Sequence, residues 1–545
     1  MTLNLKIPSL PSLPTSVQQS VDELLAWWGE SLARKGVQNV PRWVWVGGSV
    51  LGAVLCFRFY YQSTYGVWKT QGIPGPKPYP VVGNMLAWMT CKDFFDMEVE
   101  EHKQFGSKGY YGIFYGSKPS LVVTDPDIIA EVMIKKFDLF PNRTEVKGFE
   151  PKYFRKNISD LRGEEWKKVR NALTPTFTGL KLKKMVPFMN EIGIHLGGKF
   201  ERILETSAQE FELKPMFRSC TMDIILNIVF GISVDSQAGE NEIANACMNM
   251  TLKNEQLFKN PLRILPFVVP GLAKLWGIFE PNLGFNVDAG DVTAKIMLDI
   301  LQKKQEGKDD AERTFFLHTL VEKFELHQAT KGKEGLDFET TVAQALIFLL
   351  AGFDTTANLL MWVSYYLALY PELQEEVYTE ICSLAGPDAE DDTYENVNKM
   401  QLLENFVMET LRLRSVFRTQ REAISDTTIG PGIKIKKGYA VEVAVNVIHR
   451  DPKIWGDPET FRPSRFNPEE AKTRSPYAFN AFGIGPRNCI GMRLALFEVK
   501  MAFVKILSRF QLSMGKDTPT EVTEFMKSGF YDPVKPLFLK VSKRE

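Results

Sequence analysis

The ten residues Phe482–Gly491, with the sequence FGIGPRNCIG, constrain the fold of this chain more than any other segment. The glycines and the proline predict a tight loop, and the apolar spacing that begins at Met492 predicts a helix directly behind it. Cys489 is therefore expected at a helix N-terminus, where backbone N–H groups and the helix dipole favour the thiolate. A thiolate can hold a metal ion or attack a substrate, so the loop indicates a site of chemistry.

The neighbours of this cysteine favour a metal in a large flat ligand. Gly485 and Gly491 would let the backbone approach such a ligand closely, Phe482 could shield the sulfur, and Arg487 would supply a cation for an acidic edge. This set suits an axial thiolate on haem iron. The alternative is an inert buried thiol, which is the interpretation of the other five cysteines. The pattern FxxGxRxCxG resembles the signature of the cytochrome P-450 family, the haem-thiolate monooxygenases.

Composition excludes several other classes. The 545 residues are 44% hydrophobic and 24% charged, which is typical of a packed globular protein. Lys plus Arg equals Asp plus Glu at 66 each, so nucleic acid is not expected as a partner. The six cysteines contain no CxxC pair, which disfavours a zinc site and a disulfide scaffold.

The fold class follows from periodicity. Helical spacing recurs at residues 162–173, 182–205, 339–369, 371–384, 400–412 and 491–510, and strand-like runs occur at Leu121–Thr124, Ile433–Ile435 and Ala440–Val445. The sequence therefore predicts a mainly α protein with small β-sheets, in one large domain over residues 81–545. The resemblance implies that this domain has the cytochrome P-450 fold.

The N-terminal part predicts a membrane attachment. Residues 1–42 read as a tail with a short amphipathic helix, residues 43–61 as a transmembrane anchor, and residues 62–80 as a stiff proline-rich spacer. A buried core helix or a signal-peptide core are the alternatives for 43–61, and the flanking basic residues do not set its orientation. Pro261–Phe279 could be core or a second membrane contact, and the resemblance favours the membrane. We expect the endoplasmic reticulum membrane, with the catalytic domain facing the cytosol.

The segment Ala351–Thr356, with the sequence AGFDTT inside a long apolar helix, is similar to the family's oxygen-activating motif. The resemblance implies that Asp354 and Thr355 pass protons to bound dioxygen and that Gly352 leaves room for it. Two other interpretations remain: a Thr hydroxyl bonded to its own i−4 carbonyl, or a second membrane span interrupted by Asp354.

Two further motifs precede the cysteine in the family's order. Glu409 and Arg412 form an ExxR pattern that shares one helix face, and Pro463–Phe466 resembles the family's PxRF loop. The resemblance implies that Glu409, Arg412 and Arg465 form a buried network that stabilises the fold near the haem.

Candidate ligands for the haem propionates come from three places. Trp166 and Arg170 resemble the family's WxxxR helix, Arg418 matches the position of another propionate ligand, and Arg143 is a weaker match. Arginine suits this role because its planar fork matches a carboxylate. The stretch Leu413–Phe417 departs from the Pro-Pro turn that many members have here, so the shape of the substrate cavity is the feature least determined.

The resemblance implies a function and partners. The cofactor would be haem b, and the reaction would insert one oxygen atom of O2 into a lipophilic small molecule of the xenobiotic, steroid or fatty-acid class. Electrons would come from an NADPH-dependent reductase, with a cytochrome b-type protein as a further donor. A basic cluster that could dock an acidic reductase comprises Lys167, Lys168, Lys181, Lys183, Lys184, Arg493 and Lys500. The Cys-loop style is closest to the animal microsomal xenobiotic-metabolising group. The alternatives are a haem-thiolate isomerase or dehydratase acting on a peroxide, and a non-catalytic haem-binding sensor or carrier.

Overall fold

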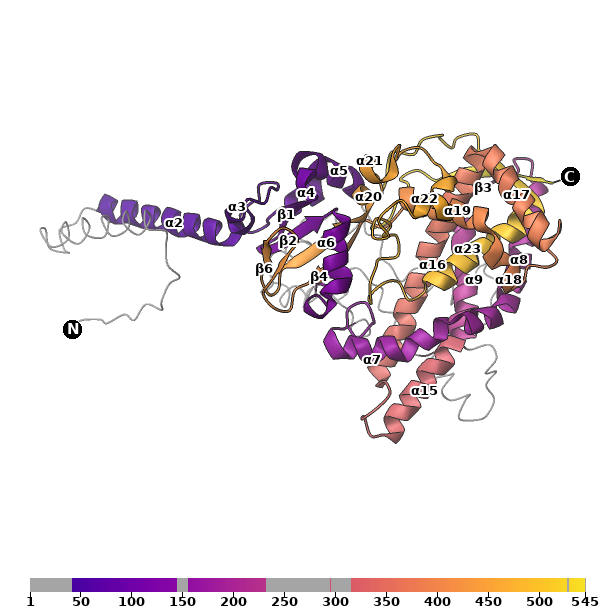
Figure 1. Ribbon diagram of the computed structural model, residues 1–545, viewed down its shortest axis with the longest axis horizontal. Coiled ribbons are helices and arrows are strands. Elements are labelled where there is room, and N and C mark those ends of the chain that lie inside the picture. Colours follow the sequence, from indigo (N-terminus) through magenta and orange to yellow (C-terminus); the bar gives the residue numbers. More distant parts are fainter. Residues whose placement is uncertain (1–41, 145–154, 232–294, 296–314, 527–528, 545) are drawn as a thin grey trace, which may run out of the picture. The chain divides into compact units, whose positions relative to one another are not determined.

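The computed structural model describes residues 42–144, 155–231, 295, 315–526 and 529–544 (Figure 1). The predicted amphipathic helix of the tail and the apolar stretch Pro261–Phe279 lie outside these ranges. The chain divides between Val67 and Trp68 into two units.

The described part of the first unit is helix α2, Arg42–Tyr65. It covers the segment predicted to span a membrane, and its large apolar side chains are solvent-exposed, among them Val46, Val50, Val54 and Phe57. Among the described residues, the helix that is long and apolar enough to cross a membrane by length and mean hydropathy is not α2 but α16 (Phe338–Leu369). The most apolar window of α16 is 67% buried inside the protein, as expected for a core helix, so the structure does not support the interpretation of AGFDTT as part of a membrane span.

The second unit is mainly helical with small sheets, as predicted. Helix α16 runs through its centre, packed against α9, α19 and α23 (Figure 1). Asp337 caps α16 by accepting a hydrogen bond from the Thr340 N–H, and Pro371 begins the next helix. Within the described residues of this unit, the helices with six or more residues are α4 (Met85–Thr90), α5 (Phe94–Phe105), α7 (Gly163–Leu173), α8 (Gly179–Leu204), α9 (Leu213–Phe230), α15 (Phe315–Ala329), α16, α17 (Pro371–Ala385), α18 (Tyr394–Lys399), α19 (Gln401–Leu413) and α23 (Met492–Leu507).

Shorter helical turns connect these helices and strands. The four- and five-residue α-helices are α3 (Val67–Thr70), α6 (Pro126–Ala130), α20 (Val445–Ile448), α21 (Pro452–Trp455) and α22 (Pro468–Ala471). The turns of other types are η2 (Gly106–Lys108), η3 (Glu131–Lys135), η4 (Phe137–Leu139), η5 (Thr174–Phe177) and η7 (Pro463–Phe466).

The main sheet lies at one end of this unit (Figure 1) and has the strand order β1-β2-β7-β4. Its strands are β1 (Tyr110–Tyr115), β2 (Lys118–Val123), β4 (Arg418–Glu422) and β7 (Ala440–Ala444). The β2–β7 pair is parallel and the other two pairs are antiparallel. The smaller sheets are β3-β9-β8, with β3 (Glu210–Glu212), β8 (Phe510–Met514) and β9 (Phe538–Lys543), and β5-β6, with β5 (Thr427–Ile429) and β6 (Ile433–Ile435).

Part of the segment predicted as a spacer packs against β1 instead. Trp68 is 3% exposed and its indole N–H donates to the Ile113 carbonyl at 3.1 Å. Gly112 has no side chain because a Cβ there would lie 2.3 Å from the Trp68 ring. The Gly112 N–H donates to the carbonyl of Pro74 at 2.8 Å. This part of the proline-rich stretch therefore belongs to the folded unit, which contradicts the prediction of a free spacer between anchor and domain.

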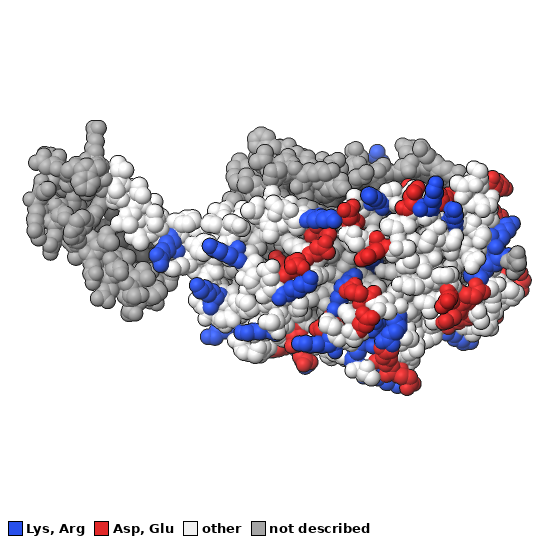
Figure 2. Space-filling view, turned by 90° about the horizontal axis from the view of Figure 1, so that it is seen from above, with Lys and Arg blue, Asp and Glu red and all other residues white. Residues whose placement is uncertain are grey.

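The charged surface shows no block of one sign on the face seen in Figure 2, where Lys and Arg are interspersed with Asp and Glu. Within the basic cluster proposed from the sequence, Lys183 pairs with Glu395 at 2.6 Å. Lys500 is 2% exposed and pairs with Glu404 at 2.8 Å. The expectation that Lys500 belongs to a docking surface is therefore wrong, because it lies on the buried face of α23.

The ExxR and PxRF motifs meet in the core. The Arg412 Nε and Nη2 donate to the two carboxylate oxygens of Glu409, each at 2.8 Å, and the Arg465 Nε lies 3.3 Å from the same carboxylate. The Glu409 and Arg412 side chains are 0% exposed. The imidazole of His449 lies beside them, accepting from the Asn480 N–H at 2.8 Å, and burial lowers its pKa to about 3. This neutral histidine connects the network to the chain that leads into the cysteine loop.

Replacing Glu409 by Gln should lower the free energy of unfolding by about 3–5 kcal/mol, because the buried guanidinium groups of Arg412 and Arg465 lose the carboxylate that they share. The matched control is Arg462→Gln, which removes an exposed pair with Glu470 and should cost less than about 1 kcal/mol. Urea denaturation of both variants measures the difference. Equal losses in the two variants would contradict the assigned importance of the buried network.

Candidate functional site

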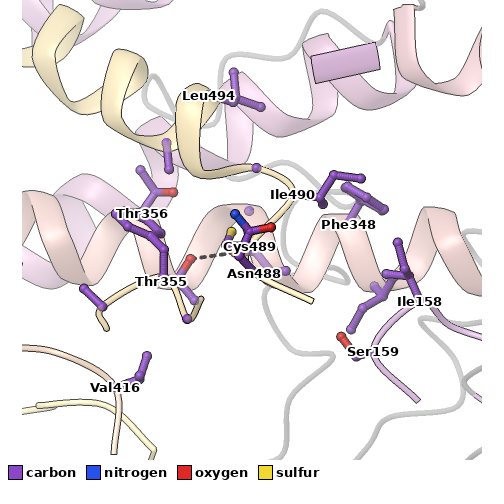
Figure 3. Close-up of a pocket in the computed structure, with 18 of the residues that line it drawn as sticks. Ile158, Ser159, Phe348, Thr355, Thr356, Val416, Asn488, Cys489, Ile490 and Leu494 are labelled. Atoms are coloured by element: carbon purple, nitrogen blue, oxygen red, sulfur yellow. Dashed lines mark hydrogen bonds between the residues drawn. The ribbon is translucent and has the colours of Figure 1, made fainter. Parts of the chain in front are cut away.

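A cavity of about 560 Å³ lies between α16 and the loop before α23. Figure 3 shows Thr355 and Thr356 on α16, and Asn488 and Cys489 on the loop, around the same space. Of the residues predicted from the sequence, those that line it are Arg143, Trp166, Arg170, Gly352, Thr355, Arg418, Phe482, Arg487, Cys489 and Gly491. Asp354 and Gly485 are not among the lining residues.

The cysteine loop is fastened at both ends. The Cys489 N–H donates to the Phe482 carbonyl at 2.8 Å, which closes the loop on itself. The Arg170 guanidinium on α7 donates to the Asn488 carbonyl at 3.0 Å and to its side-chain oxygen at 2.8 Å. Helix α23 begins at Met492, so the sulfur lies just before a helix N-terminus, as predicted.

The three glycines of the site have different reasons to be glycine. Gly491 has no heavy atom within 4 Å of an added Cβ, so its bare backbone leaves open space at the cavity. A Cβ on Gly485 would lie 2.1 Å from the Met133 carbonyl oxygen, and its φ is +76°. A Cβ on Gly352 would lie 2.3 Å from the Ile225 side chain of α9. Gly485 therefore permits a turn packed on protein backbone rather than on a ligand, and Gly352 permits the close packing of α9 against α16.

Burial raises the pKa of the Cys489 thiol. The backbone N–H groups of Gly491 and Met492 and the charges of Arg170 and Arg143 oppose this shift. The stabilisation of the thiolate that the helix N-terminus predicts is present but smaller than the cost of desolvation. A metal cation at the sulfur would reverse the balance, because coordination deprotonates a thiol. The Cys489 side chain is itself exposed at the cavity, so its sulfur is accessible to a metal there.

Two buried arginines at the edge of the cavity, Arg421 and Arg487, form no ion pair with a carboxylate among the described residues. Arg421 and Arg487 are 2% and 4% exposed, and neither Nε has a hydrogen-bond partner there. Arg487 donates to the Leu161 carbonyl at 2.7 Å and lies 4.3 Å from the Trp166 ring centroid. Burial, and then the charge of Arg143, lower the pKa of Arg421 and of Arg487 to about 9 each. Buried cations in this state require an anionic group.

Arg418 has the opposite environment. Its guanidinium lies 2.5 Å from Glu98, 3.4 Å from Glu101 and 3.3 Å from Glu442, and it is 5% exposed. The hydroxyls of Tyr111 and Tyr115 complete this shell. A side chain already surrounded by three carboxylates is poorly suited to a fourth. The geometry therefore disfavours the sequence-based assignment of Arg418 to an acidic ligand and favours Arg421.

Asp354 and Thr355 of the AGFDTT motif have different surroundings. The Thr355 hydroxyl lines the cavity and donates to the Ala351 carbonyl at 2.6 Å, which is the i−4 bond that the sequence left open. Asp354 lies 3.1 Å from the Arg218 guanidinium of α9, outside the cavity lining. In this state Thr355 faces the reaction space and Asp354 does not.

Sequence reasoning missed Arg421 and Arg218. Arg421 could have been found by strand alternation, because β4 places Arg418 and Arg421 on opposite faces. No pattern in α9 singles out Arg218, which meets Asp354 only through helix packing. The cavity is also lined by Ile158, Ser159, Phe348, Val416 and Phe417, whereas Phe353 of the AGFDTT motif is fully buried in the core.

The lining of the cavity matches the chemistry of an iron porphyrin. One wall carries a cysteine sulfur, most of the lining is apolar, and one edge carries buried cations that have no carboxylate partner among the described residues. An iron porphyrin offers a metal for the sulfur, an apolar face for the lining and two acidic groups for the arginines. The residues present fit this group.

The carboxylate cluster around Arg418 should make stability depend on pH. Burial raises the pKa of Glu98 to about 7 from an ordinary value of 4.5, although Arg418 opposes the shift. The folded state therefore binds a proton more tightly than the unfolded state, and stability falls as pH rises from about 4.5 to 7. Glu98→Gln should remove up to about 3 kcal/mol of this loss.

Thermal or urea unfolding at pH 5 to 8 measures the effect, with Glu100→Gln as the exposed control on the same helix. Parallel pH profiles for Glu98→Gln and the unmodified protein would contradict the prediction.

Comparison with known proteins agrees with this geometry. The family Cytochrome P450 matches residues 73–541. The chain is 34% identical over 514 residues to cytochrome P450 3A6 of Oryctolagus cuniculus, covering 93% of this chain and 98% of that protein. It is 33% identical to cytochrome P450 3A7 of Homo sapiens over 500 residues, covering 90% and 95%, and 33% identical to cytochrome P450 3A13 of Mus musculus over 494 residues, covering 89% and 94%. A cavity with Cys489 on its wall, together with similarity along nearly the whole chain, shows that this protein belongs to the cytochrome P450 family of monooxygenases.

Proposed function

We propose that this monooxygenase inserts one oxygen atom of O2 into lipophilic small molecules of the xenobiotic, steroid or fatty-acid class. Its electrons come from NADPH through a reductase, with a cytochrome b-type protein as a further donor. The observation that carries the proposal is the Cys489 sulfur in an apolar cavity edged by Arg421 and Arg487. Haem b, the family's cofactor, supplies the oxygen-activating iron, to which a thiolate ligand gives electron density.

The residues divide into those that hold the cofactor and those that serve the reaction. Cys489 would hold the iron, and Phe482, Gly491, Trp166 and Arg170, which line the same cavity, would hold the rest of the group. Arg421 and Arg487 would neutralise its acidic edge, because each is buried and has an Nε without a hydrogen-bond partner among the described residues, and Arg143 lines the same cavity. Glu409, Arg412 and Arg465 act at a distance, by stabilising the chain that leads into the loop.

Proton delivery is assigned to Thr355 and Asp354. The Thr355 hydroxyl donates its one proton to the Ala351 carbonyl in this state, and it can donate to an oxygen atom in the cavity after its O–H bond rotates away from that carbonyl. Asp354 can resupply that proton only after leaving Arg218, since the two are paired at 3.1 Å. The cost of opening this pair is small because both side chains are about one-third exposed, at 28% and 35%.

Membrane attachment at the endoplasmic reticulum is part of the proposal. Helix α2 carries exposed apolar side chains along its length, including Val46, Val50 and Val54, and it is long enough to cross a bilayer at 24 residues. A lipophilic substrate partitions into the same membrane. We assign the catalytic unit to the cytosolic side of that membrane, where an NADPH-dependent reductase could dock.

Two alternatives keep the same cofactor. A haem-thiolate isomerase or dehydratase would use a peroxide and need no reductase, and a sensor or carrier would bind haem without turnover. The threonine positioned at the cavity favours the monooxygenase, because proton delivery is needed chiefly for dioxygen. NADPH and oxygen consumption with a reductase, scored across steroids, fatty acids and xenobiotics, discriminates among the three.

Cys489→Ser tests the proposal directly. The unmodified protein, reduced and treated with carbon monoxide, should show the red-shifted Soret band of sulfur coordination. The variant should lose that band and at least about 100-fold of the oxygenation rate, because the oxygen ligand gives less electron density. Cys382→Ser on α17 is the control and should change neither. Retention of the red-shifted band by Cys489→Ser would contradict the proposed function.

Arg421→Gln tests whether Arg421 binds the acidic edge of the haem. Two measurements address this: the stability of the haem-free protein and the rate of haem loss. Removing a buried cation should stabilise the haem-free protein, because the cation has no carboxylate partner among the described residues. The same change should speed haem loss to an acceptor protein by about 10-fold or more, because a charge-assisted hydrogen bond is lost. Gln420→Ala, on the opposite face of β4, is the control. If haem loss is unchanged in Arg421→Gln, this residue does not hold the cofactor.

A further inference from the structure

The segment Leu413–Phe417, where the sequence departs from the family's Pro-Pro turn, is held by one arginine among aromatic rings. The Arg414 guanidinium carbon lies 4.4 Å from the ring centroid of Trp362, 5.1 Å from Phe525, 5.2 Å from Tyr531 and 6.0 Å from Tyr366. Its Nε donates to the Tyr366 hydroxyl at 3.1 Å. No described carboxylate pairs with it, so ring faces and a hydroxyl provide its contacts.

The backbone at this position is not one that proline could adopt. Arg414 has φ −127° and its N–H donates to the Thr410 carbonyl at 2.8 Å. Proline fixes φ near −65° and has no N–H. The N–H bond to Thr410 and the ring contacts of the guanidinium therefore hold both the backbone and the side chain of Arg414 in place.

Two stretches of the cavity wall meet at this arginine. Ser415, Val416 and Phe417 follow it directly, and all three line the cavity. The Phe417 N–H donates to the Gly529 carbonyl at 3.0 Å, and Gly529 and Phe530 line the cavity as well.

The C-terminal stretch is held from the same side. Trp362 donates from its indole N–H to the Tyr531 carbonyl at 2.8 Å, and both rings face Arg414. Phe95 stacks on Tyr531 with centroids 3.7 Å apart and meets the Phe417 ring at 5.9 Å. A movement of Arg414 would therefore displace both stretches of the cavity wall, Ser415–Phe417 and Gly529–Phe530.

We propose that Arg414 is a positioning residue that determines ligand specificity, by holding Ser415–Phe417 and Gly529–Phe530 in one arrangement. It does not touch the ligand. Ligands wide enough to press on this wall depend on it, and ligands confined to the neighbourhood of Cys489 do not. The inference rests on the proposed function, since it assigns this wall to substrate.

The test uses the full-length holoenzyme and three N-substituted imidazoles of increasing width: 1-methylimidazole, 1-benzylimidazole and 1-tritylimidazole. Each coordinates iron through its free ring nitrogen, so spectral titration gives a dissociation constant for each. The variants are Arg414→Met, which keeps length and loses charge, and Arg414→Lys, which keeps the charge. Arg509→Met is the control, since Arg509 lies over the Phe510 ring at the surface and pairs with Glu201.

In Arg414→Met, binding of 1-tritylimidazole should weaken by about fivefold or more, because the loosened wall must be ordered on binding. Binding of 1-methylimidazole should stay within about twofold, since it does not reach the wall. The dissociation constant of Arg414→Lys for 1-tritylimidazole should lie between those of Arg414→Met and the unmodified protein. The dissociation constants of Arg509→Met should match those of the unmodified protein. An equal change for all three ligands, or none, would overturn the proposal.

If Arg414→Met fails to fold, Tyr366→Phe decides the question. This variant removes the hydroxyl that accepts from Arg414 and keeps the ring. The ratio of the trityl to the methyl dissociation constants should still rise, by about twofold, and an unchanged ratio would reject the role of Arg414. Failure of the proposed function is a different outcome, because the unmodified protein would then lack the thiolate-type carbon monoxide spectrum.

Discussion

The site depends on the loop before α23 being held in place before any ligand binds. The loop is closed by the bond from the Cys489 N–H to the Phe482 carbonyl and is tied to α7 by Arg170 through Asn488. Each hydrogen bond contributes little stability alone, but together they hold the Cys489 sulfur at the wall of the cavity opposite α16. A ligating atom that is positioned in advance does not have to be ordered when the metal arrives.

Buried arginines are used in three ways in this chain, and the surroundings decide which. Arg412 shares a carboxylate in the core and stabilises the fold. Arg421 and Arg487 have no carboxylate partner among the described residues and are suited to a ligand. Arg414 is held by aromatic rings and shapes a wall. A guanidinium is suited to all three roles because it is planar, remains charged and can stack.

Much of the fold could be predicted from the sequence because periodicity and end signals are local. The expected helices over 339–369 and 371–384 and the strand over Ile433–Ile435 match α16, α17 and β6 within one residue at each end. The cysteine loop could be predicted because its residue types are confined to ten positions. What could not be predicted depends on long-range packing: the pairing of Asp354 with Arg218, the burial of Lys500, and the three carboxylates that surround Arg418.

The packing of Trp68 on Gly112 bears on where the chain can be shortened. Its indole fills the space that a side chain at position 112 would occupy, and the strand beneath it pairs with β2 in the main sheet. Removing Trp68 would leave a groove along β1 and an unsatisfied Ile113 carbonyl. A truncated form made for crystallisation or bacterial expression should therefore keep this tryptophan, with the cut placed before it rather than at the prolines that follow.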